Sequence, residues 1–100
     1  MSPTLEITMI KPAEELGPVL TSRSLAEDLR ARIEALTARG EAVVVDFEGV
    51  EAVSPSFADE IFAKLPNDLV ESGQVKFENI AEDLQHLVDF VVAGRSRATS

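Results

Sequence analysis

The segment Val43–Leu65, VVVDFEGVEAVSPSFADEIFAKL, begins with an apolar run that Ala42 extends by one residue. Polar and apolar residues do not alternate in this run, and three of its four members are β-branched. A short unbroken run of this kind is typical of a strand that is covered on both faces of a parallel sheet. We therefore predict that Ala42–Phe47 is the central strand of such a sheet.

The second half of the segment, Ser54–Leu65, has the apolar spacing of an amphipathic helix. Ser54 is the expected N-cap, because Pro55 then occupies the first helical position, where proline is favoured. Ser56 is the rival cap. In both cases a hydroxyl lies in the first helical turn, where free backbone N–H groups stabilise a phosphate. The alternative interpretation is that both serines only cap the helix.

Strands and helices alternate along the rest of the chain. Further strands are predicted at Thr4–Ile10 and Val75–Ile80, and further helices at Ser22–Arg39 and Ala81–Val92. In the first strand, Leu5, Ile7 and Met9 are expected to share the buried face, and in the second helix Phe57 and Ile61 are expected to be buried. Ala13–Thr21 is predicted to be a loop with a short extended piece at Val19–Leu20.

This order predicts an α/β fold with a mainly parallel sheet of three to four strands and three helices. We assign residues 1–93 to one domain, because about 100 residues form a single core. Residues 94–100 are small and polar, and we predict that they form a flexible C-terminal tail.

The composition excludes several classes of function. The chain has 100 residues, with 18 acidic and 9 basic side chains, a net charge of −9, and no cysteine, tryptophan or tyrosine. A negative charge opposes binding to nucleic acids and anionic membranes, and the lack of cysteine excludes thiolate metal sites. No signal-peptide pattern begins the chain, and no apolar run approaches the ~20 residues that span a bilayer. We expect a cytoplasmic protein without a cofactor.

Acidic side chains gather where the central strand meets the second helix. They are Asp46, Glu48, Glu51, Asp59 and Glu60. Ligands of open α/β sheets bind beyond the carboxyl ends of the strands, and carboxylates there could hold a magnesium ion. The alternative is a solvated acidic rim, with Glu60 and Lys64 as an ordinary ion pair one helical turn apart. The one histidine, His86, is expected at the surface or at the boundary of the core.

Two motifs of this region resemble those of the STAS domain, the fold of anti-sigma factor antagonists. They are Asp46-Phe47-Glu48-Gly49-Val50, which matches D-L-x-G-V, and Ser54-Pro55-Ser56-Phe57, which aligns with D-S-S-G. The chain resembles more closely a STAS-like family of unknown function, whose members carry D-F-x-G-V, then S-x-S-F-A-D-E, and a serine–arginine pair before the first helix. The pair corresponds to Ser22-Arg23, and the similarity covers most of Thr21–Val92. The resemblance places the phosphorylated serine of the STAS motif on Ser56.

The resemblance implies a regulatory protein-interaction module without enzymatic activity. Its expected partner is a histidine-kinase-like ATPase or an anti-sigma factor, and phosphorylation of a serine is the expected switch. The candidate residues for partner binding or phosphorylation are Ser56, Ser54, Pro55, Asp46, Asp59 and Glu60. Two other classes stay open: a metal-binding or enzymatic domain that uses the carboxylates at the strand end, and a structural component of a larger assembly.

Overall fold

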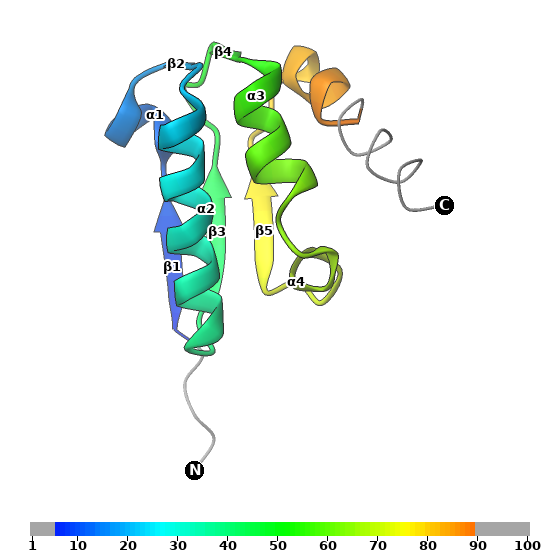
Figure 1. Ribbon diagram of the computed structural model, residues 1–100. Helices are drawn as coiled ribbons and strands as arrows, with labels where there is room; N and C mark the ends of the chain where they lie inside the picture. The colour runs from blue at the N-terminus through cyan, green and yellow to red at the C-terminus, as the bar shows by residue number, and fades with distance from the viewer. Residues whose placement is uncertain (1–5, 90–100) are drawn as a thin grey trace.

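Three parallel strands form the main sheet of the protein. The structure is a computed structural model that describes residues 6–89. The strands are β1 (Ile7–Ile10), β3 (Ala42–Asp46) and β5 (Val75–Glu78), in the order β1-β3-β5 (Figure 1). The prediction of a central strand with parallel neighbours is therefore confirmed, with β3 ending one residue earlier than predicted.

A second, smaller parallel sheet lies beyond the carboxyl ends of β1 and β3. It consists of β2 (Val19–Leu20) and β4 (Ala52–Val53), which Figure 1 shows at the top of the molecule. The backbone N–H of Ser54 continues this pairing, because it donates to the carbonyl of Leu20 at 2.9 Å. This sheet joins the segment before the helix Arg23–Ala38 to the segment before the helix that begins at Pro55.

The three predicted helices are present, the third as far as residue 89, where the described residues end, and two short helices were not predicted. The helices are α1 (Pro12–Leu16), α2 (Arg23–Ala38), α3 (Pro55–Ala58), the π-helix η1 (Asp59–Ala63), α4 (Asn67–Glu71) and residues 82–89. The predicted second helix corresponds to α3 and η1 together. The expectation that residues 13–21 form a loop was wrong for α1, where Pro12 occupies the first helical turn and Gly17 ends the helix at φ 96°.

The sheet is covered on one face by α2 and α3, which Figure 1 shows in front of it. Ile10, Val43 and Val45 point to that side and are at most 1% exposed. On the other face Ile7 is 67% exposed and Met9 52%, and Val44 is only partly buried. The prediction that β3 is covered on both faces was therefore wrong for the described residues.

The predicted inward face of the first strand was also wrong. Ile10 pairs with Val45, so the register with β3 turns Ile10 toward the helices and leaves Ile7 and Met9 on the open face. The reason is that side chains alternate along a strand, and Ile10 is out of phase with Ile7 and Met9. Leu5 lies outside the described residues.

The core lies between the sheet and the helices. Phe57 and Ile61 are fully buried, as predicted. Three phenylalanines form an aromatic cluster, in which the Phe62 ring lies 4.8 Å from Phe77 and 5.5 Å from Phe47. Within residues 6–89, no helix combines the length and apolar character that a membrane span requires. The predicted tail, residues 94–100, and the end of the predicted domain at residue 93 lie outside the described residues.

Candidate functional site

The turn after β3 is built by the first predicted motif. The Asp46 carboxylate accepts a hydrogen bond from the Glu48 backbone N–H at 2.9 Å, and the Phe47 carbonyl accepts one from the Val50 N–H at 3.0 Å. Gly49 has a φ of 86°, a conformation that favours glycine at this position of a tight turn. A Cβ at Gly49 would also lie 3.2 Å from the Cβ of Ala13. The motif is therefore explained by the geometry of the turn.

Asp46 also connects β3 to β5 at the carboxyl ends of these two strands. Its Oδ1 accepts a second hydrogen bond, from the Asn79 side-chain amide at 2.8 Å. These hydrogen bonds from Asn79 and from the Glu48 N–H hold the pKa of Asp46 below its ordinary value, because they stabilise the charged form. Asp46 is 5% exposed, and its Oδ1 links the turn after β3 to the residue that follows β5.

Ser54 is the N-cap of α3, as predicted. Its Oγ accepts a hydrogen bond from the Phe57 N–H at 3.1 Å and donates one to the Thr21 carbonyl at 3.3 Å. Thr21 directly precedes Ser22, which caps α2 in the same manner through the Leu25 N–H. The side chain of Ser54 therefore fixes the start of α3 against the start of α2.

The rival cap, Ser56, is left without a capping role. Ser56 is partly exposed in the first turn of α3, and its hydroxyl has no hydrogen-bond partner among residues 6–89. Pro55 beside it is exposed. The start of α3, which the Ser54 cap fixes, thus exposes the Pro55 ring and a Ser56 hydroxyl that has no hydrogen-bond partner within residues 6–89.

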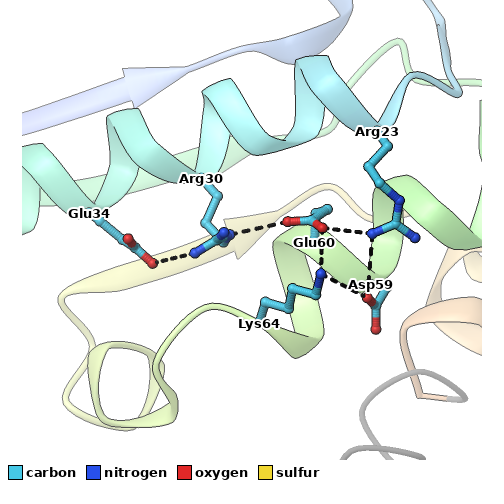
Figure 2. A network of polar contacts seen from close by, with 6 residues as sticks. All are labelled: Arg23, Arg30, Glu34, Asp59, Glu60 and Lys64. Carbon is cyan, nitrogen blue, oxygen red and sulfur yellow. Dashed lines mark hydrogen bonds and ion pairs between the residues drawn. The ribbon is translucent and has the colours of Figure 1, made fainter.

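A buried carboxylate with three cationic partners lies one helical turn further along. Glu60 is 1% exposed, and its oxygens lie 2.6 Å from Lys64 Nζ, 2.7 Å from Arg23 Nη1 and 3.3 Å from Arg30 Nε (Figure 2). The hydrogen bond from Lys64, with those from Arg23 and Arg30, holds the pKa of Glu60 below its ordinary value although burial opposes this. Glu60 is therefore a charged group that joins α2 to η1.

Two further acidic residues complete the network of Figure 2. Asp59 Oδ2 lies 3.9 Å from Lys64 Nζ and 4.0 Å from Arg23 Nη1. Glu34 accepts a hydrogen bond from Arg30 Nη1 at 3.0 Å, one turn along α2. The network thus contains three acidic and three basic side chains and is balanced in charge.

Two acidic residues of the network, Asp59 and Glu60, lie in the π-helix η1. The Lys64 N–H donates to the Asp59 carbonyl at 3.0 Å, five residues back, and η1 spans Asp59–Ala63. Single π-turns insert one extra residue into a helix and occur frequently at functional sites. In this segment Glu60 turns toward α2 and Ile61 toward the core.

The structure divides the predicted site residues into two groups. Asp46 and Glu60 are buried and have internal partners, whereas Ser54, Pro55, Ser56 and Asp59 retain exposed surface. The acidic residues predicted as a possible magnesium site do not converge: within residues 6–89, no three acidic or histidine side chains lie close enough to hold a metal ion. Glu48 and Glu51 are exposed on the turn, and His86 is exposed as expected.

Sequence reasoning missed Arg23 and Arg30 as partners of Glu60. Both lie on α2, seven residues apart, which is two helical turns and therefore one face. That spacing is the signal that could have shown that both reach the same neighbour. The Glu60–Lys64 pair was anticipated from its separation of four residues.

The fold and this helix-start surface define a small α/β domain of the STAS-like class. The profile of the family "STAS-like domain of unknown function (DUF4325)" matches residues 26–85. The match covers more than half of the chain, so the chain belongs to this family. It includes the whole of Ser54–Glu60 but begins three residues after Arg23. No curated protein and no solved structure matches the chain.

Proposed function

We propose that this protein is a non-enzymatic regulatory module that binds a protein partner through the start of α3. The proposed contact surface consists of Ser54, Pro55, Ser56 and Asp59, and the proposed switch is phosphorylation of the Ser56 hydroxyl. The proposed partner is a histidine-kinase-like ATPase or an anti-sigma factor, the class that the resemblance to STAS domains implies.

The observation that carries the proposal is the setting of Ser56. Its hydroxyl is partly exposed and has no partner within residues 6–89, while the backbone around it is held by the Ser54 cap and by Pro55. A rigid helix start presents a side chain to a partner at a lower entropic cost than a mobile loop does.

The charges near Ser56 also support a switch at this position. The carboxylates of Asp46, Asp59 and Glu60 carry the same sign of charge as a phosphate on Ser56 and would oppose it if they were free. In the structure Glu60 is already paired with three cations, and the Asp46 carboxylate is engaged by Asn79 and the Glu48 N–H. Asp59 is then the acidic neighbour of Ser56 that retains exposed surface.

The absence of enzymatic activity is part of the proposal. Asp46 and Glu60, two of the three buried carboxylates within residues 6–89, accept hydrogen bonds that stabilise the fold. A general acid or base needs access to a substrate proton, and the three cations around Glu60 occupy its carboxylate in this arrangement. These contacts therefore support a binding function.

The test is a pulldown from native lysate with the wild type, Ser56→Ala and Ser56→Asp, with thermal melts in parallel. We expect the wild type and Ser56→Ala to recover the same kinase-like ATPase or anti-sigma factor, identified by mass spectrometry, and Ser56→Asp to lose it without a change in melting temperature. Ser72→Asp is the matched control, because Ser72 is exposed at the end of α4, at the opposite end of the molecule. Equal recovery by all four proteins would remove Ser56 as the switch.

A further inference from the structure

We propose that the guanidinium of Arg23 receives the phosphate when Ser56 is phosphorylated. This inference rests on the proposed function and names the residue that would convert the modification into a change of surface. It assigns Arg23, the first residue of α2, to the switch.

The helical spacing places Ser56 on the same face as Asp59 and Glu60, the two acidic partners of Arg23. The Asp59 N–H donates to the Ser56 carbonyl, so Ser56 is one helical turn before Asp59 and Glu60 and shares a face with them. Arg23 Nη1 lies 2.7 Å from Glu60 Oε1 and 4.0 Å from Asp59 Oδ2. Phosphoserine carries its anionic oxygens about as far from the backbone as glutamate does, so the phosphate and the Glu60 carboxylate would lie around one guanidinium.

Arg23 has donors to spare for this contact. Its side chain is 48% exposed, and both of its ion pairs within residues 6–89 run through Nη1. Within residues 6–89, its Nε and Nη2 have no hydrogen-bond partner. A guanidinium carries five N–H donors in a planar fork that matches two phosphate oxygens.

The remaining charges allow Arg23 to turn toward the phosphate. Lys64 and Arg30 would still hold Glu60, at 2.6 Å and 3.3 Å, so the buried carboxylate would not be left unpaired. Removing the last partner of a buried charge is costly, whereas loosening one of three is not. Asp59 opposes the phosphate, but Lys64 Nζ lies 3.9 Å from it and offsets part of this repulsion.

The modification itself is an ordinary phosphoryl transfer from a nucleoside triphosphate bound to the kinase-class partner. The Ser56 oxygen forms a bond to the γ-phosphorus, the bond from that phosphorus to the bridging oxygen breaks, and the diphosphate leaves. The hydroxyl proton passes to a base of the partner or to water. The product carries a charge of about −1.5 to −2 at neutral pH, beside Arg23.

The experiment is a ³¹P NMR titration of the full chain with phosphoserine incorporated at position 56 during translation. We expect the phosphate pKa to be lower by about 0.5–1 unit in the wild type than in Arg23→Gln, because a nearby cation stabilises the dianion. Arg32→Gln is the matched control: Arg32 is on the same helix but pairs with Glu15 at 2.7 Å, and its removal should leave the titration unchanged. Identical titrations in the wild type and Arg23→Gln would overturn the proposal.

A further variant covers the case in which Arg23→Gln fails to fold. Arg23→Lys keeps the ion pair with Glu60 but removes the fork, and we expect a phosphate pKa above that of the wild type. An unchanged value in Arg23→Lys would overturn the proposal in that case. No partner is present in these titrations, so their failure would leave the pulldown result standing, and failure of the pulldown would leave the Arg23 contact standing.

Discussion

Glu60 shows how a single residue can hold two elements together. Its carboxylate is 1% exposed and is the common partner of Arg23, Arg30 and Lys64. We expect Glu60→Gln to lower the free energy of unfolding by about 2–4 kcal/mol, because it leaves three clustered cations without their shared anion. The cations are partly exposed, which keeps the loss below the upper end observed for buried pairs.

Urea denaturation at pH 7 measures this loss. Glu14→Gln is the control, because Glu14 is 71% exposed and its ion pair with Lys11 is 3.6 Å long. The control should change the free energy of unfolding by less than about 0.5 kcal/mol. Equal effects of the two substitutions would show that the network of Figure 2 contributes no more than a surface pair.

The same residue predicts a dependence of stability on pH. The pKa of Glu60 in the folded protein lies below its ordinary value of 4.5, and that of Asp46 lies below 3.8. A lowered pKa contributes stability that is fully present above the unfolded-state pKa and is lost as the pH falls through the folded-state pKa. We therefore expect the urea midpoint to be steady near neutral pH and to fall as the pH drops below about 4.5.

Glu60→Gln separates the contribution of this one carboxylate from the others. Glutamine does not titrate, so the difference in stability between wild type and variant should shrink toward low pH. Parallel curves from pH 7 to pH 3 would contradict the lowered pKa of Glu60. Asp46 titrates in both proteins and therefore cancels from the comparison.

Local sequence patterns predicted some site residues and not others. Ser54 could be predicted as the N-cap because the serine, the proline that follows and the helix lie within a few residues. The partners of Glu60 could not, because Arg23 and Arg30 are 37 and 30 residues away in the sequence. Contacts of that range depend on how α2 packs against η1, which no local pattern specifies.

The elements show the same division. The run Ala42–Val45 predicted the central strand, because the inner strands of parallel sheets typically carry continuous apolar, β-branched sequences. It did not predict that one face of β3 is open, because Val44 is apolar on the open face just as Val45 is on the covered one. The short α1 was missed because five residues carry too little periodicity to separate a helix from a loop.

Neighbouring valines of β3 provide a test of this one-sided sheet. Val45 is fully buried under the helices, whereas Val44 is partly buried on the opposite face. We expect Val45→Asp to abolish folding, since it buries an unpaired charge, and Val44→Asp to leave a folded domain with a lower melting temperature. Circular dichroism and two-dimensional NMR distinguish the two outcomes. Loss of folding in both variants would mean that the second face is also covered in solution.

At the scale of the whole molecule, the family could be predicted from two short motifs. The D-F-x-G-V turn and the S-x-S-F-A-D-E helix start are both explained by the structure, the first by the Asp46 and Gly49 geometry and the second by the Ser54 cap and Glu60. The motifs therefore predict the fold well because they are part of its framework. The Ser56 hydroxyl has no partner among residues 6–89, so its function had to be proposed from its exposure.

The distribution of charge over the molecule leads to a last prediction, on nucleic acids. The chain has a net charge of −9 and 9 basic residues, of which seven lie within residues 6–89. Six of these seven already form ion pairs with acidic side chains: Lys11, Arg23, Arg30, Arg32, Arg39 and Lys64. Lys76 is the one basic residue of that range without an ion pair, and Arg95 and Arg97 lie outside the described residues. These three cations are few against the roughly 6–10 phosphate contacts of a typical DNA-binding protein, and the net charge of −9 opposes them.

We therefore expect no retardation of DNA or RNA by this protein in a gel-shift assay at about 50 mM salt, where electrostatic binding is strongest. A basic protein of similar size serves as the positive control. Glu60→Gln raises the net charge by one and frees part of the cationic cluster, so it is the variant in which weak binding would appear first. Retardation by the wild type that disappears as the salt concentration rises would contradict the prediction and would move the function from protein binding toward nucleic-acid binding.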